Sequence, residues 1–234
     1  MESKTIKKVV AFDFDDTLAK TKSLIGVRLR DPTGDTKEYL SGVGVSYKSE
    51  QGGYLLVDSM NYEILESSCE SPHDVFHFDY TQTMNIDLRT AREITFMFKK
   101  LQIAYDDPAV LPIIVTARAG VVTEFSPVKQ RYVKSQNRPK ILRFLEKRGI
   151  VIPPKNLHTV GDTYGDTAEA KRNVLNSYLQ SLKLDEMIFY DDSERNVIAT
   201  MELRNSLPTG CRLRVYQVKD GACRLRCSYV GREG

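Results

Sequence analysis

Short apolar runs alternate along this chain with longer segments in which apolar residues recur every three or four positions. The short runs are typical of strands buried in a parallel sheet, and the longer segments are typical of amphipathic helices that cover it. The alternation therefore predicts an α/β fold with a Rossmann-like, doubly wound parallel sheet. The expected strands lie in the first part of residues 9–18 and at 111–115, 157–160 and 187–190. The expected helices lie at residues 89–101, 138–148, 167–183 and from 193 to about 204.

The last part of the chain has a period-two pattern. Residues 211–218 and 222–230 alternate apolar and charged side chains around Asp220-Gly221, a dipeptide typical of tight turns. We expect a C-terminal β-hairpin at the edge of the sheet. Its arginines are typical of the charges that protect an edge strand from aggregation.

Residues 20–86 interrupt the α/β rhythm. They are rich in Gly, Ser and Tyr, contain short β-like pieces such as residues 53–57, and show no helix comparable to those downstream. Their many Tyr and Phe residues argue against a disordered loop. An insertion directly after the first strand is well placed to cover a site at the end of that strand. We therefore expect a catalytic core of residues 1–19 and 87–234, with residues 20–86 inserted as a small β-rich cap.

The composition limits the class of protein. With 234 residues, of which 41% are hydrophobic, the chain can bury a substantial core, and its formal charge of +3 is too small to imply wholesale nucleic-acid binding. No apolar run approaches the roughly 18 residues of a membrane span, and the N-terminus lacks the apolar core of a signal peptide. The four cysteines fit reduced thiols better than a disulfide framework. We expect a cytoplasmic protein with no membrane partner, and the sequence leaves its oligomeric state open.

Groups suited to catalysis stand at the ends of three expected strands, and Lys171 stands early in the helix before the last of them. Because the carboxyl ends of parallel strands lie along one edge, these residues should converge. Crowded carboxylates repel one another, so a divalent cation is expected among them, and hard oxygen ligands favour Mg²⁺. The strand-end residues are Asp13, Asp15, Thr116, Asp191 and Asp192.

In this order, the motifs closely resemble those of the haloacid dehalogenase superfamily. That family has Asp-x-Asp-x-Thr after its first strand, Thr or Ser after the second, a Lys upstream of the fourth, and paired acids after the fourth. The resemblance covers about two thirds of the chain. The insertion and the Phe-Tyr-Asp-Asp-Ser ending are similar to phage-encoded members. The matching segments are Asp13-Phe14-Asp15-Asp16-Thr17, Thr116 in Ile-Val-Thr-Ala-Arg, Lys171, and Asp191-Asp192-Ser193-Glu194-Arg195-Asn196.

The resemblance implies a role for each matching residue. Asp13 would be the nucleophile that forms an aspartyl-phosphate, and Asp15 would protonate the leaving oxygen and then activate water. Thr116 and Lys171 would hold phosphoryl oxygens, with Lys171 also offsetting the carboxylate charge, and Thr17 would bind substrate. The implied Mg²⁺ ligands are Asp13, the backbone carbonyl of Asp15, and Asp191, with Asp192 contacting a metal-bound water.

The acid at position 15 distinguishes among relatives. Phosphatases of the family carry an Asp there, transport ATPases carry Thr, and dehalogenases lack the acid and use no metal. Asp15 therefore implies hydrolysis of a phosphomonoester, and phosphomutases, which share this Asp, remain a minor alternative.

The last acidic motif has a second candidate. Asp162 and Asp166 also resemble it, with Lys155 as the upstream lysine. That assignment leaves no obvious third strand before Lys155, and it leaves Asp191 and Asp192 unexplained after a well-formed strand. We therefore favour Asp191 and Asp192, and Asp162 is then expected at a neighbouring strand end.

Basic residues indicate the substrate class. Residues 128–148 hold eight Lys and Arg against one acid, a stripe that attracts a nucleotide or nucleic-acid end, or is simply the solvated face of a helix. Arg118 follows Thr116 by two positions and is a candidate for binding a second phosphate or the substrate body. The preferred substrate is a nucleotide or a polynucleotide 3′-phosphate, and sugar phosphates stay open. The alternatives to an enzyme are a binding or scaffold protein that retains the fold, and a nucleic-acid-binding protein with little catalysis.

Overall fold

The computed structural model describes residues 5–21, 23–80, 88–126, 131–161, 166–219 and 222–232. Contacts between residues divide the chain into two units. The core unit comprises Met1–Thr21, Ala91–Val122 and Gln136–Gly234, and the second unit comprises Lys22–Thr90 and Thr123–Ser135. The catalytic core and cap expected from the sequence stay a prediction, and residues 123–135 group by contact with the second unit.

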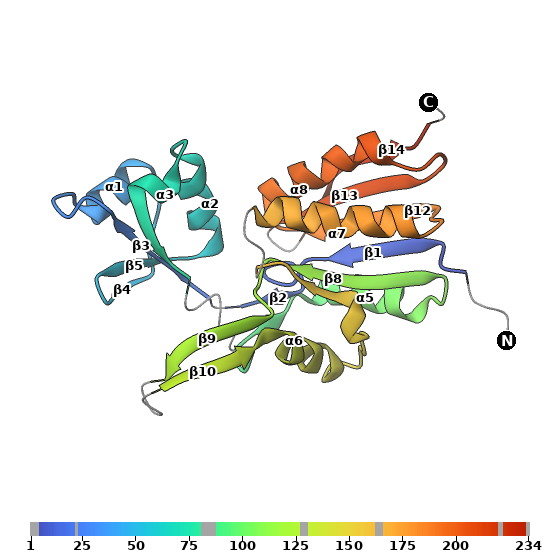
Figure 1. The fold of residues 1–234 in the computed structure, drawn as a ribbon, viewed down its shortest axis with the longest axis horizontal. Coiled ribbons are helices and arrows are strands. Elements are labelled where there is room, and N and C mark those ends of the chain that lie inside the picture. The colour runs from blue at the N-terminus through green and yellow to red at the C-terminus, as the bar shows by residue number, and fades with distance from the viewer. Residues whose placement is uncertain are drawn as a thin grey trace. The chain divides into compact units, whose positions relative to one another are not determined.

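A six-stranded sheet organises the core unit, in the order β11-β8-β1-β12-β13-β14 (Figure 1). Neighbouring strands are parallel except for β14, which pairs antiparallel with β13. From β1 the chain moves outward through β8 to β11, and it then returns to the other side of β1 for β12 and β13. The strands are β1 (Lys8–Phe12), β8 (Val110–Thr116), β11 (Leu157–Thr159), β12 (Glu186–Asp191), β13 (Arg212–Lys219) and β14 (Ala222–Val230).

This topology confirms the doubly wound sheet and the C-terminal hairpin. The turn of the hairpin, at residues 220–221, lies outside the described residues. Because the strand order reverses beside β1, a crevice is expected between the carboxyl ends of β1 and β12, where doubly wound sheets bind ligands.

The helices of the core unit differ from expectation mainly at their ends. The helix expected at residues 89–101 begins only at Thr95, because Arg92–Glu93 form the short strand β7, which pairs with β2 (Ala19–Lys20). The helix expected to reach about residue 204 ends at Met201 and continues as a 3₁₀ turn over Glu202–Ser206. The α-helices are α5 (Thr95–Asp106), α6 (Asn137–Glu146), α7 (Thr167–Ser181) and α8 (Glu194–Met201), and a further 3₁₀ turn spans Pro154–Asn156.

Strand β1 is buried on both faces, which explains its unbroken apolar run. Val9 and Ala11 belong to the same buried cluster as Leu175 of α7. Directly after the strand, the ring of Phe14 meets Phe144 of α6 edge to face, with 5.5 Å between their centroids. Each such large apolar side chain stabilises the fold by about 1.5–3 kcal/mol, so the strand end that precedes the acidic residues is firmly held.

The second unit contains helices that the sequence pattern did not predict. Its four-stranded antiparallel sheet has the order β4-β5-β3-β6, and a buried cluster that includes Val27, Leu65 and Phe76 fills its core. The expectation of no comparable helix is wrong, since α2 is longer than α8 of the core unit. Aspartate carboxylates cap the amino ends of α1 and α2. The elements are β3 (Ile25–Leu29), α1 (Thr36–Gly42), β4 (Ser49–Gln51), β5 (Tyr54–Val57), α2 (Ser59–Ser67), α3 (Pro72–Val75) and β6 (Phe76–Asp79).

One further hairpin was not expected. Strands β9 (Val121–Ser126) and β10 (Arg131–Gln136) pair only with each other among the described residues, and β10 takes up part of the basic stripe of residues 128–148. None of the helices in the described ranges combines the length and the apolar composition that a membrane span requires.

Candidate active site

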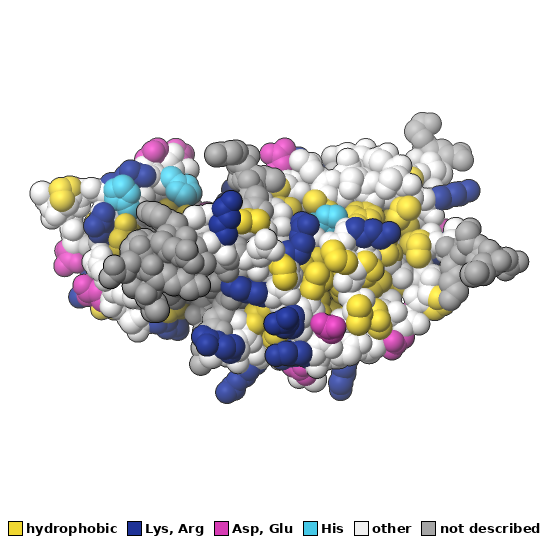
Figure 2. Space-filling model, turned by 60° about the horizontal axis from the view of Figure 1, so that its bottom comes forward, with side chains coloured by type: hydrophobic (Ala, Val, Ile, Leu, Met, Phe, Trp, Pro, Cys, Tyr) yellow, Lys and Arg dark blue, Asp and Glu magenta, His cyan; other side chains and the backbone are white. Residues whose placement is uncertain are grey.

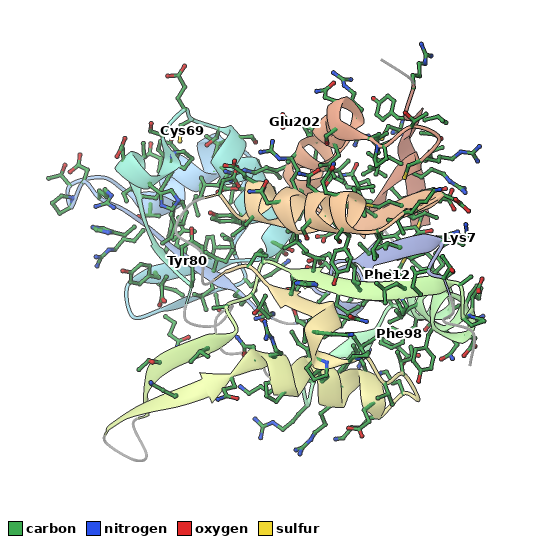
Figure 3. The ribbon with its side chains drawn as sticks, turned by 45° about the vertical axis from the view of Figure 1, so that its right-hand side comes forward. Lys7, Phe12, Cys69, Tyr80, Phe98 and Glu202 are labelled. Carbon is green, nitrogen blue, oxygen red and sulfur yellow. The ribbon has the colours of Figure 1, made fainter. Side chains whose placement is uncertain are left out.

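The carboxyl edge of the central sheet brings Asp13 and Asp191 together. Figure 3 labels Lys7 just before β1 and Phe12 at its end, so this edge lies on the Phe12 side. Asp13 follows β1, and its backbone N–H donates to the carbonyl of Tyr190 at 2.9 Å. Asp191 is the last residue of β12. Both carboxylates are buried, at the point where the strand order reverses.

Lys171 lies between these two carboxylates. Its position on the first turns of α7 directs the side chain to the strand ends, and Nζ donates to Asp13 Oδ1 at 2.6 Å and to Asp191 Oδ2 at 2.8 Å. The Lys171 side chain is only 1% exposed. Isolated buried charges are costly, and this one is compensated by two opposite charges. The structure therefore brings together three residues that the motifs singled out, from segments distant in the sequence.

Burial is the main cause of the raised pKa values of the acids in this group. Burial raises the pKa of the Asp13 carboxyl to about 8, against the lowering effect of Lys171, and the charges of Asp191 and Asp15 raise it further. Burial, together with the charges of Asp13 and Asp191, raises the pKa of Asp192 well above its usual value. The pKa of Lys171 is also raised: burial opposes its charge, but Asp13 and Asp191 stabilise the ammonium form.

These residues fit a divalent cation. Asp13, Asp191 and Asp192 each offer a carboxylate oxygen, and the three oxygens lie within 4.8 Å of one another. With Lys171 included, three carboxylates and one ammonium leave an excess of two negative charges, which a divalent cation would balance. An all-oxygen ligand set suits Mg²⁺. The expected contribution of the backbone carbonyl of Asp15 stays a prediction.

Further hydrogen bonds fix the orientation of the acids. Asp191 Oδ1 accepts from the backbone N–H of Ser193 at 3.0 Å and from Asn196 Nδ2 at 2.9 Å. The hydroxyl of Thr17, expected to bind substrate, donates to Asp192 Oδ1 at 3.2 Å. Asn196 was matched only as part of the last motif, and its place one turn into α8 explains why it can reach Asp191.

Asp15 lies in a different set of contacts. Arg118 binds both of its oxygens, with Nε 2.7 Å from Oδ2 and Nη2 2.6 Å from Oδ1, and Thr21 Oγ1 donates to Oδ1 at 2.5 Å. The sequence indicated Arg118 as a substrate-binding residue, whereas here its guanidinium holds the expected acid–base group. Thr116, buried at the end of β8, accepts the Arg118 backbone N–H on Oγ1 at 3.3 Å.

Gly161 positions the loop that carries Arg118. Its N–H donates to the Arg118 carbonyl at 3.1 Å. A Cβ on Gly161 would lie 2.3 Å from the carbonyl oxygen of Ala117 and 2.6 Å from the nitrogen of Ala119. Only glycine permits this approach of the two backbones. The sequence reasoning missed this role, and a glycine directly after the third strand was its only signal.

The alternative acidic motif is partly outside the described residues, since these exclude Asp162. Asp166 caps α7, where its Oδ1 accepts the N–H of Ala168 at 2.8 Å, and its Oδ2 lies 3.2 Å from Arg195. These contacts are structural ones. The choice between the two motifs therefore stays a prediction for Asp162.

The structure describes the basic stripe only in part. Residues 127–130 lie outside the described ranges, and Arg148 pairs with Glu93 at 2.9 Å and stacks on the ring of Phe144. On the face drawn in Figure 2, some Lys and Arg side chains lie next to one another, and others stand apart among apolar and uncharged surface. The interpretation of the stripe as a nucleic-acid site stays a prediction.

Comparison with known proteins gives a limited likeness. No family model and no curated protein matches the chain. Two solved structures of the HAD domain of effector protein Lem4 from Legionella pneumophila are similar. The first, an inactive mutant, has a TM-score of 0.40 and 15% identity, covering 92% of this chain and 87% of that one. The second has a TM-score of 0.38 and 16% identity, covering 94% and 90%. At TM-scores below 0.5 the likeness is loose, and neither the family nor the activity of this chain follows from it.

Proposed function

We propose that this protein hydrolyses phosphomonoesters through a covalent intermediate on Asp13, with Mg²⁺ as its cofactor. The observation that supports this proposal is the group of buried Asp13 and Asp191, joined by Lys171, with the partly buried Asp192 beside them, at the reversal point of a doubly wound sheet. The motif resemblance to haloacid dehalogenase phosphatases supports the same reaction. A group of buried charges this costly is typical of a catalytic site.

In the first step, a carboxylate oxygen of Asp13 forms a bond to phosphorus while the bond from phosphorus to the ester oxygen breaks. Lys171 keeps Asp13 oriented through Oδ1 and offsets its charge. Asp15 gives a proton to the departing oxygen. Because Arg118 occupies both oxygens of Asp15, part of this contact must be exchanged before Asp15 carries a proton. Arg118 is thus a positioning residue for the acid–base group.

In the second step, a water molecule attacks the phosphorus atom of the intermediate. Asp15 takes the proton of this water, the bond between phosphorus and Asp13 breaks, and phosphate leaves. Asp13, Asp191 and Asp192 would hold Mg²⁺, which when bound supplies positive charge for the negative charge that develops on the phosphoryl oxygens. A nucleotide or polynucleotide 3′-phosphate is the proposed substrate class, and the protein would act in the cytoplasm.

The experiment that tests the proposal measures phosphate release from para-nitrophenyl phosphate, with Mg²⁺ and with EDTA. Wild-type protein should turn over only with Mg²⁺. Asp13→Asn should lose at least about a thousandfold in kcat, because the nucleophile is absent. Asp185→Asn is the matched control, since Asp185 is an exposed acid of the same unit, and it should keep full activity.

A second panel separates the alternatives. Nucleotides, phosphorylated oligonucleotides and sugar phosphates should be hydrolysed at different rates, with nucleotide substrates fastest. Folded wild-type protein that releases no phosphate from any of them in Mg²⁺ would support the scaffold interpretation instead. Equal rates on all three classes would remove the preference for nucleotides.

A further inference from the structure

A polar hollow of about 390 Å³ lies between the start of α8 and the end of the C-terminal hairpin where β13 finishes and β14 begins. Its walls include Gln217 and Lys219 from β13, Arg224 and Arg226 from β14, and Glu194 from α8. This volume is within the range of pockets that hold small ligands, about 300–1,000 Å³. The steps of the reaction above do not use any of these side chains.

The hollow lies on the same edge of the sheet as Asp13 and Asp191. Strand β13 runs parallel to β12, and Gln217 pairs in register with Asp191. The Gln217 side chain also contacts the site directly, because Nε2 donates to the backbone carbonyl of Asp192 at 3.2 Å. From β1, two to three strand spacings lead to β13 and β14, a distance of about 10–14 Å.

The charges in the hollow suit a dianion. Arg226 is already engaged, since it donates to Gln217 Oε1 and, at 2.9 Å, to Glu194. Glu194, the partner of Arg226, is the one acid among the described residues that line the hollow. With Lys219 and Arg224 included, this described lining carries two positive charges in excess. Arg and Lys side chains placed in this way are the usual ligands of phosphate.

We propose that this hollow binds a second phosphate of the substrate, which stays on the product while the phosphate at Asp13 is removed. The inference rests on the proposed function, whose substrate class it narrows. This spacing of about 10–14 Å is measured between strand backbones, and the long Lys219 and Arg224 side chains can cover part of it. Two phosphates joined directly, as in pyrophosphate, are still too close together to occupy both places, so at least a sugar must stand between them. Such a second phosphate belongs either to a bisphosphorylated sugar or nucleoside, or to the backbone of an oligonucleotide.

The test compares a double variant with a matched control. Lys219→Ala/Arg224→Ala removes the two excess positive charges of the hollow. Arg212→Ala/Arg232→Ala removes the same charge from exposed positions at the opposite end of the hairpin, where Arg212 begins β13 and Arg232 follows β14. Binding is measured by calorimetry on proteins that also carry Asp13→Asn, so that no probe is consumed. Turnover is measured without Asp13→Asn.

The probes differ in their second phosphate. They are a nucleoside 3′-phosphate, a nucleoside 3′,5′-bisphosphate, a dinucleotide 3′-phosphate and a sugar bisphosphate. The hollow variant should weaken binding of a probe with a second phosphate by about tenfold or more, because charged hydrogen bonds are lost. It should leave the nucleoside 3′-phosphate unchanged, and the control pair should change neither. The probe most affected identifies the source of the second phosphate.

The two proposals can fail separately. Equal loss for probes with and without a second phosphate, or no loss for any probe, would overturn the role of the hollow even if phosphate is released. Selective loss of binding with no release of phosphate from any probe would keep the hollow as a phosphate site and overturn the proposed hydrolysis.

Discussion

The two units of this protein differ in how far their ion pairs are buried. In the core unit, Lys171 pairs with Asp13 and Asp191, and the three side chains are 1%, 5% and 0% exposed. In the second unit, Lys37 pairs with Glu50 at 2.9 Å, and both side chains are 52% exposed. Every buried residue with an ionisable side chain of Asp, Lys or Arg type in the described part of the chain, Arg118 included, belongs to the core unit.

The difference in burial indicates which charged residues have a role other than stability. An exposed ion pair contributes little, because water solvates both charges almost as well as the partner does. A buried pair costs more in lost hydration than a well-packed apolar pair would, so its presence calls for a role other than stability. The second unit is held by apolar and aromatic contacts, such as the edge-to-face pair of Tyr39 and Phe76. We therefore expect substitutions of charged residues to have large effects in the core unit and small ones in the second.

The largest contrast in stability should come from the two lysines. Lys171→Met leaves two buried carboxylates without their partner and should lower the free energy of unfolding by about 3–5 kcal/mol. Lys37→Met breaks an exposed pair and should leave the free energy of unfolding almost unchanged. Urea unfolding of both variants without metal measures the two values. Similar losses of stability for the two lysine variants would contradict the expected difference between the buried and the exposed ion pair.

The cation site should respond strongly to pH. Because burial raises the pKa of Asp13 to about 8, the metal-free protein holds a proton on this group below that pH, and a cation must displace it. Mg²⁺ affinity should therefore fall as pH falls from 8 to 6, by up to about tenfold per pH unit for the proton on Asp13. Calorimetric titration at several pH values measures this slope.

Variants of single aspartates test which acids hold the cation. Asp13→Asn removes one displaced proton and should make the pH slope shallower. Asp191→Asn should weaken Mg²⁺ binding more than Asp162→Asn does. The reverse order would show that the alternative acidic motif holds the cation, and affinity independent of pH would contradict the protonation of Asp13.

The contact of Arg118 with Asp15 should affect rate rather than stability. A lysine has no planar fork, so Arg118→Lys cannot bind both oxygens of Asp15. We expect kcat to fall by about 10–100-fold and the pH profile of kcat to shift, because orientation and protonation of Asp15 both change. Arg30→Lys, in the second unit, replaces an exposed arginine that binds the His73 carbonyl and should leave kinetics unchanged. A lower kcat with the same pH profile would argue against a role through Asp15.

Substitution of two glycines should have the smallest effects on stability and activity. Gly161→Ala forces apart the backbones that position Arg118 and should destabilise the protein by about 1–3 kcal/mol, with a lower kcat. Gly42→Ala in α1 meets nothing within 4 Å and should be neutral or slightly stabilising, because alanine favours a helix. Thermal unfolding and turnover of both variants provide the measurement. Full activity in Gly161→Ala would show that the loop of Arg118 needs no such support.

Much of the core unit could be predicted from the sequence. Strand β1, which Asp13 follows, and the strands that end at Thr116 and Asp191 are buried on both faces, and such strands leave an unbroken apolar run. The short strand β7 could not be predicted, because two residues carry no periodicity. The helices of the second unit are short, and the local signal that the sequence offered for two of them was the aspartate that caps each of α1 and α2.

From the sequence alone, the candidate residues could be singled out and placed at strand ends, because apolar runs and motif spacing are local properties of the chain. The tertiary structure alone decided the pairings: Lys171 between Asp13 and Asp191, Arg118 on Asp15, and Lys219 with Arg224 in one hollow. Each pairing joins segments whose separation is set by strand order and register. That order follows from the packing of the whole sheet and is not encoded in any one segment.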